Sequence, residues 1–64
     1  MGTVERRHKG RQITVEARDD THTLTFTGKV ESISEDGLTF VLLGSDGRVR
    51  SLWREQFQVV TGED

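Results

Sequence analysis

The chain of 64 residues lacks cysteine and proline and has no long apolar run. Without cysteine, neither a disulfide framework nor a zinc–thiolate site can stabilise the domain. No segment approaches the roughly 20 apolar residues of a membrane helix, and residues 1–9 lack the apolar core of a secretory signal. These absences predict a soluble, cytoplasmic protein that does not bind a membrane.

The sequence also lacks the patterns on which catalysis depends. It has no nucleophile elbow, and its glycines do not have the spacing of a phosphate-binding loop. His8 and His22 are too isolated to indicate a metal site. A chain of this size also has little room for a buried cleft. We therefore predict no enzymatic activity, no metal and no cofactor.

Charge is unevenly distributed along the chain, whose net charge is −2. Residues 1–11 contain four basic residues and one acidic residue, a net charge of +3, whereas the rest of the chain has a net charge of −5. A basic arm can contact phosphate groups, and chain termini are usually poorly ordered. We therefore expect a flexible basic arm at residues 1–9, one small domain at 10–61 and a tail at 62–64.

Alternation of apolar and polar residues predicts a series of short strands. Residues 12–18 alternate in the manner of a half-buried strand. Asp36-Gly37 and Asp46-Gly47 separate later runs of β-forming residues, and Asp-Gly supplies the positive-φ residue that a tight hairpin turn requires. The predicted inward-facing residues are Ile13, Val15, Ala17, Leu24, Phe26, Val30, Ile33, Leu38, Phe40, Leu42, Val49, Leu52 and Phe57.

The longest predicted strand, which begins near residue 23, has Gly28 at an inward position. A glycine inside a strand marks a bend, a bulge or a close approach of two backbones. We predict a bend at Gly28 and a bulge near Glu31 and Ser32, which returns Ile33 to the core. Residues 53–56 show no alternation and predict one 3₁₀ turn before the last strand.

Five short strands with this spacing predict an all-β fold: a strongly bent, antiparallel small β-barrel of the SH3-like or Sm-like type. An OB barrel would insert a longer helix between its third and fourth strands, where this chain has a tight turn at Asp46-Gly47.

Residues 13–60 resemble the Sm-like proteins, among them the bacterial RNA chaperone Hfq. The similarity lies in residues 28–32 (GKVES), residues 40–43 (FVLL) and residues 53–57 (WREQF). The Sm-like barrel of the Rho inhibitor Rof fits almost as well. This resemblance implies an RNA-binding or regulatory function. In the ring-forming members, it also implies assembly through strand edges.

The chain departs from the Sm-like RNA chaperones at two points. Those proteins begin with a helix that packs on the barrel, whereas residues 1–9 of this chain are mostly polar. Their uridine pocket uses a Lys-His pair where this chain has Arg54 and Glu55, and a carboxylate repels phosphate. The resemblance therefore supports the fold better than the RNA site.

Basic and aromatic residues late in the chain are the best candidates for an RNA contact. Trp53 is the only tryptophan, and an arginine beside an aromatic face can stack a base and neutralise phosphate. In the alternative interpretation, Trp53 covers the open end of the barrel and the arginine stems pack on it. The predicted nucleic-acid contact set is Lys29, Arg48, Arg50, Trp53 and Arg54.

Three hypotheses follow for the function. The first is a non-enzymatic module that binds single-stranded RNA through this basic and aromatic patch. The second is a protein–protein interaction module that regulates a nucleic-acid machine, which the net negative charge of the domain favours. The third is a designed barrel without a natural ligand. We expect a monomer or a weak dimer rather than a ring, because the chain has no N-terminal helix.

Overall fold

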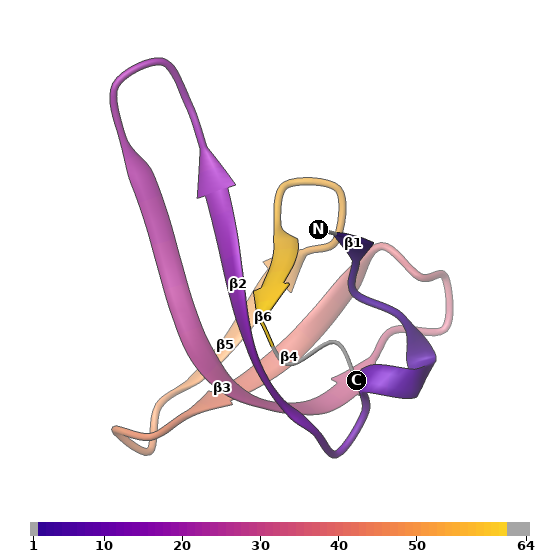
Figure 1. Ribbon diagram of the computed structural model, residues 1–64. Helices are drawn as coiled ribbons and strands as arrows, with labels where there is room; N and C mark the ends of the chain where they lie inside the picture. The colour runs from indigo at the N-terminus through magenta and orange to yellow at the C-terminus, as the bar shows by residue number, and fades with distance from the viewer. Residues whose placement is uncertain (1, 62–64) are drawn as a thin grey trace.

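The computed structural model describes residues 2–61, which form six strands in one antiparallel sheet (Figure 1). The strands follow the spatial order β1-β6-β2-β3-β4-β5. Their bounds are β1 Gly2–Thr3, β2 Gln12–Arg18, β3 Thr23–Ile33, β4 Thr39–Gly44, β5 Val49–Trp53 and β6 Gln58–Thr61, and the 3₁₀ helix η1 spans Arg6–His8.

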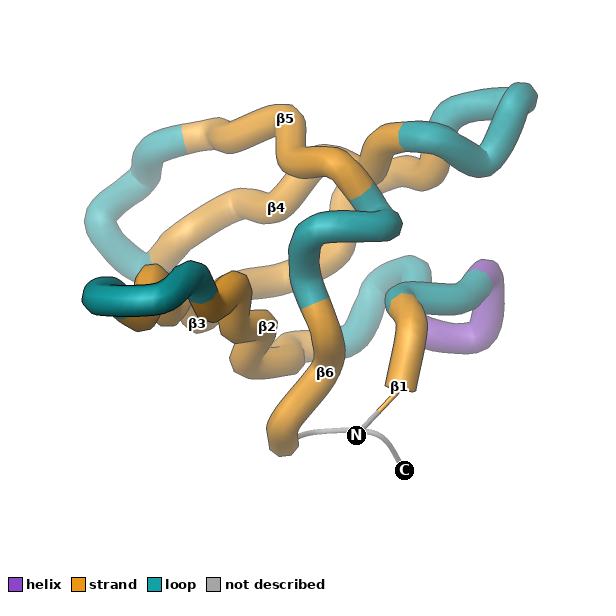
Figure 2. Tube along the Cα trace, turned by 90° about the horizontal axis from the view of Figure 1, so that it is seen from above, coloured by secondary structure: helices purple, strands orange, loops and turns teal. Residues whose placement is uncertain are grey.

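The sheet does not close, which corrects the expected five-stranded barrel. The last strand, β6, pairs with β2 and β1, whereas β5 pairs only with β4 among the described residues. The turn after β5 carries the chain to a different part of the curved sheet, as Figure 2 shows. One edge of β5 is therefore left without a strand partner within residues 2–61. The all-β, antiparallel character of the prediction is confirmed.

Strand β3 joins the two halves of the sheet. Its first part pairs with β2, and its second part pairs with β4. Gly28 lies in both ladders, opposite Ile13 and Gly44, and is buried. The register with β4 shifts between Val30 and Ser32, which confirms the predicted bulge. The β2–β3 hairpin projects beyond the rest of the sheet (Figure 1).

Both predicted Asp-Gly turns are present, and the aspartate of each turn accepts hydrogen bonds from its own loop. Gly37 and Gly47 have φ values of 75° and 81°, in the region that glycine adopts without strain. Asp36 Oδ1 accepts hydrogen bonds from the Ser34 hydroxyl at 2.6 Å and from Leu38 N–H at 3.0 Å. Asp46 Oδ1 accepts one from Arg48 N–H at 2.9 Å. These bonds fix the hairpins on both sides of β4.

The core lies on the concave face of the sheet. Its buried apolar residues are Val4, Ile13, Val15, Val30, Phe40, Leu42, Phe57 and Val59, with Ala17, Phe26, Ile33 and Leu52 packed against them. Most predicted inward positions are therefore confirmed, but three are wrong: Leu24, Leu38 and Val49 are 56%, 55% and 64% exposed. Leu24 lies on the projecting hairpin and Leu38 in the turn before β4. Val49 is opposite Leu43, so its side chain lies on the outer face.

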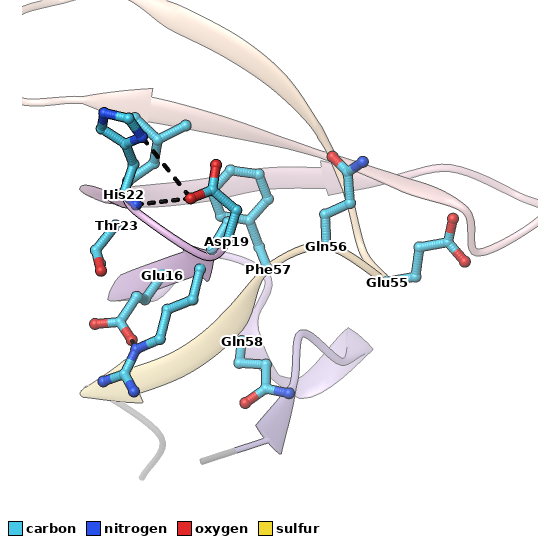
Figure 3. Close-up of a pocket in the computed structure, with 11 residues that line it drawn as sticks. Glu16, Asp19, His22, Thr23, Glu55, Gln56, Phe57 and Gln58 are labelled. Carbon is cyan, nitrogen blue, oxygen red and sulfur yellow. Dashed lines mark hydrogen bonds and ion pairs between the residues drawn. The ribbon is translucent and has the colours of Figure 1, made fainter.

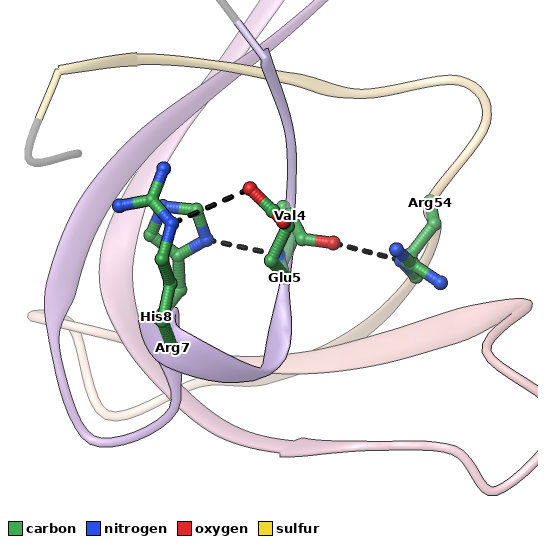
Figure 4. Close-up of polar contacts among 5 residues, drawn as sticks. All are labelled: Val4, Glu5, Arg7, His8 and Arg54. Carbon is green, nitrogen blue, oxygen red and sulfur yellow. Dashed lines mark hydrogen bonds and ion pairs between the residues drawn. The ribbon is translucent and has the colours of Figure 1, made fainter.

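The segment expected to be a flexible arm is folded onto the sheet. Strand β1 pairs with β6, and Val4 and His8 are fully buried. Glu5 N–H donates to His8 Nδ1 at 2.9 Å (Figure 4), and His8 N–H donates back to the Glu5 carbonyl at 2.9 Å. One apolar residue and one buried histidine thus anchor a segment whose composition is otherwise polar. The tail at 62–64 lies outside the described residues.

The helical turn is at a different place from the one expected. The 3₁₀ helix is η1, whereas residues 54–56 before β6 form a hydrogen-bonded turn in which Gln56 N–H donates to the Trp53 carbonyl at 3.2 Å. No helix among residues 2–61 is long and apolar enough to cross a membrane.

Candidate functional site

Arg54, one of the predicted RNA contacts, connects three segments of the fold. Its Nε donates to the Val4 carbonyl at 2.8 Å (Figure 4), and its NH1 donates to the Gly37 carbonyl at 2.7 Å. Both acceptors are neutral, so no carboxylate compensates the guanidinium charge in these two bonds. Arg54 thus fixes the N-terminal segment and the β3–β4 turn beside the end of β5.

Arg50 lies on the concave face, because it is directly opposite the buried Leu42. Its guanidinium is 4.8 Å from the centre of the Phe26 ring, and NH2 is 3.4 Å from Asp46 Oδ2. Its side chain is 29% exposed. The hydrogen bond from Arg48 N–H, followed by the hydrogen bond from the Arg50 side chain and the charges of Arg50 and Arg48, lowers the pKa of Asp46.

The other predicted contacts are exposed at different places. Arg48 has a side chain that is 78% exposed, and its Nε is 3.9 Å from Asp46. Lys29 is opposite Leu43, and Trp53 is opposite Thr39, at the other end of β4. Trp53 is 51% exposed and shares the outer face with Lys29, whereas Arg50 points to the concave face. The predicted set is therefore divided between two faces of the sheet.

The free edge of β5 is the feature that brings accessible groups together. Gly44 N–H donates to the Arg48 carbonyl at 2.8 Å and Arg54 N–H to the Leu38 carbonyl at 2.9 Å, at the two ends of the β4–β5 ladder. Hydrogen-bonded and non-bonded residues alternate along such a ladder. The backbone N–H and C=O groups of Val49 and Ser51 and the N–H of Trp53 therefore point away from β4, toward solvent, whereas the Trp53 carbonyl accepts the Gln56 N–H.

Side chains on the outer face extend this edge. Val49, Ser51 and Trp53 are exposed, and Val49 and Trp53 are 64% and 51% exposed. Next to them on β4, the half-buried Leu43, Val41 and Thr39 occupy the same face. β5 contains no lysine or proline, and its outer-face side chains, Val49, Ser51 and Trp53, do not block pairing with another strand.

A small hollow lies where β5 ends. It has a volume of about 390 Å³ and is lined by Thr3, Gly37, Leu38, Trp53, Arg54 and Glu55. Leu38 and Trp53, both more than half exposed, make it partly apolar. An extended chain that pairs with β5 would reach this hollow beyond Trp53.

A second, wider groove lies between the β2–β3 hairpin and the turn after β5 (Figure 3). Its volume is about 810 Å³, and its lining includes Glu16, Asp19, His22, Glu55 and Phe57. Asp19 accepts backbone hydrogen bonds from Thr21 at 2.9 Å and His22 at 2.6 Å, and these bonds lower its pKa.

Two pairs of polar side chains in this groove form within the hairpin itself. Glu16 pairs with Arg18 at 2.5 Å, and Asp19 Oδ1 is 3.8 Å from His22 Nδ1. No group of three or more metal-binding side chains exists within residues 2–61. Outside the hairpin, the groove is also lined by the polar residues Glu55, Gln56 and Gln58.

Sequence reasoning missed the hollow and the anchoring function of Arg54. The alternation in residues 49–53 did carry a signal for an apolar outer face, but the face of each side chain depends on the register with β4.

No family model, no curated protein and no solved structure matches this chain.

Proposed function

We propose that this protein is a non-enzymatic interaction module that binds an extended polypeptide segment of a partner protein along β5. The observation that supports this proposal is the free edge, where the backbone groups of Val49 and Ser51 and the N–H of Trp53 point outward beside exposed apolar side chains. In strand addition, backbone hydrogen bonds supply affinity, and pockets for alternate side chains supply specificity. The hollow beside Trp53 is a suitable pocket for one such side chain.

The binding test uses a capped, uncharged peptide of alternating valine and threonine. Binding should shift the amide resonances of Val49, Ser51 and Trp53 and change the fluorescence of Trp53, the only tryptophan. Ser51→Pro should abolish these changes, because it removes an outward N–H that β4 does not use. Shifts confined to other strands, or no change at any peptide concentration, would contradict the proposal.

Single-stranded RNA is the second candidate ligand, because Lys29, Arg48 and Trp53 are all exposed cationic or aromatic side chains. Arg50 is less suited to this function, because its guanidinium is held at Phe26 and Asp46. RNA binding should lose affinity steeply with salt, with a log–log slope of roughly −0.7 per phosphate contacted. Oligouridine and oligoadenine at low salt are the appropriate probes.

Within the same proposal, we assign the protein to the SH3-like and Sm-like type and to the cytoplasm, as a monomer or weak dimer. The long bent β3 and the short antiparallel strands around it support the fold assignment. Strand β1 pairs with Gln58 and Val59 and so occupies part of the β6 edge. That pairing hinders a head-to-tail ring in which β5 of one copy would bind β6 of the next.

A further inference from the structure

We infer that the segment that pairs with β5 is acidic, an inference that rests on the proposed function. The segment is an extended strand with a carboxylate at each end and an apolar residue next to each carboxylate. Residues 48–54 contain three arginines and no acidic residue, a net charge of +3. Opposite charges on directly facing residues stabilise strand pairs, whereas like charges destabilise them.

The charges at the two ends of β5 are the least compensated. Arg48 is 78% exposed, and its nearest carboxylate, Asp46, is 3.9 Å away. Arg54 donates hydrogen bonds to two neutral carbonyl oxygens. Arg50, in the middle, is 3.4 Å from Asp46 and stacks on Phe26, so its charge is partly satisfied within the chain. Carboxylates are therefore favoured opposite Arg48 and Arg54 rather than opposite Arg50.

The residues between the arginines define the rest of the segment. Val49 and Trp53 project from the outer face and favour apolar partners, which β-branched or aromatic side chains supply. Ser51 lies between them and accommodates a small polar residue. The recognised strand thus has a glutamate or aspartate at each end, an apolar residue next to each of these, and polar residues between the two apolar residues.

Charge also favours an acidic peptide over β5 of a second copy of the chain as the strand that pairs with β5. Antiparallel self-pairing centred on Ser51 would place Arg48 of one copy opposite Arg54 of the other, and the like charges would repel. RNA would match the positive charge but would leave the outward N–H and C=O groups of β5 without the alternating partners that a peptide backbone supplies.

The probe is a capped peptide with glutamate at each end, valine next to each glutamate and threonine between the valines. Its sequence is the same in both directions, so it tests parallel and antiparallel pairing together. The control peptide has lysine in place of both glutamates. We expect the glutamate peptide to bind about tenfold more tightly at low salt, and this ratio to shrink as salt is added.

Two charge-reversal variants test whether the preference for the glutamate peptide arises at the edge of β5. Arg48→Glu should remove or invert the preference for the glutamate peptide, because it places a carboxylate at one end of the edge. Lys29→Glu is the matched control: it reverses an exposed cation of the same sheet at β3, away from β5, and should leave the preference unchanged. Circular dichroism verifies that both variants are folded.

The outcomes separate the inference from the proposed function. Equal binding of both peptides at the amides of Val49, Ser51 and Trp53 would overturn the acidic specificity and leave strand addition intact. Failure of both peptides to shift these amides would overturn both. Tight binding of oligouridine that Lys29→Glu weakens as much as Arg48→Glu does would replace the peptide with RNA as the ligand.

Discussion

Gly28 allows β3 and β4 to approach more closely than a side chain would permit. A Cβ atom at this position would collide with the carbonyl oxygen of Leu43 and would lie 2.8 Å from its carbonyl carbon. Both are backbone atoms of β4, so a rotamer change cannot relieve the contact. The close approach occurs where β3 leaves β2 and begins to pair with β4.

Replacement of this glycine should therefore destabilise the fold. We expect Gly28→Val to lower the free energy of unfolding by about 1–3 kcal/mol through overpacking, as measured by urea denaturation. Ser32→Val is the matched control, since Ser32 lies exposed on the same strand. An unchanged denaturation midpoint for Gly28→Val would refute the close approach of the two backbones.

Arg54 stabilises the molecule through geometry that a lysine cannot reproduce. Its planar guanidinium reaches the carbonyl groups of Val4 and Gly37 at the same time. We expect Arg54→Gln to cost about 1–3 kcal/mol of unfolding free energy, with Arg54→Lys intermediate. Arg48→Gln, at a largely exposed arginine of the same region, should change stability by no more than about 0.5 kcal/mol. Equal effects of Arg54→Gln and Arg48→Gln would show that Arg54 is not an anchor.

Three turns each depend on an aspartate whose pKa is lowered by hydrogen bonds from its own loop. The main causes are Thr21 N–H for Asp19, the Ser34 hydroxyl for Asp36 and Arg48 N–H for Asp46. Because the folded-state pKa lies below the usual 3.8, each carboxylate contributes stability that is present above that pH. The contribution is lost as the pH falls through the folded-state value.

Acid should therefore loosen the hairpins. We expect the urea midpoint to be constant near neutral pH and to decrease as the pH falls below about 4. In the Asp36→Asn, Asp46→Asn double variant, the decrease should be smaller, since the amide oxygens can still accept the backbone bonds but do not titrate. A double variant with the same acid dependence as the original chain would show that these turns are not responsible.

Among the elements, the five strands β2 to β6 and both Asp-Gly turns were predicted from the sequence, because alternation and positive-φ glycines are local signals. The sequence could not predict β1, since a two-residue strand has no period, or the anchoring of residues 2–9 by Val4 and His8. The predicted RNA-contact residues lie on two faces of the sheet for a related reason. Arg50 and Trp53 are three residues apart on one strand, so they lie on opposite faces once the register with β4 is fixed.

The whole molecule is an open, curved sheet in which one end is partly covered and the other is not. At one end, β1 pairs with part of β6, whereas β5 at the other end is free within residues 2–61. We expect light scattering coupled to size exclusion to give the protomer mass in dilute solution, with at most weak dimerisation at high concentration. A mass of five to seven protomers that does not change on dilution would contradict this expectation and favour the ring.

Amide hydrogen exchange in dilute protein shows whether the edge of β5 is open. The amides of Arg50 and Leu52 face β4 and should exchange slowly, whereas those of Val49, Ser51 and Trp53 should exchange almost as fast as in an unfolded chain. Binding of the glutamate-ended peptide should slow these three and leave Arg50 and Leu52 unchanged. Equal, slow exchange of all five amides without peptide would mean that another part of the chain covers β5 and that the strand has no free edge.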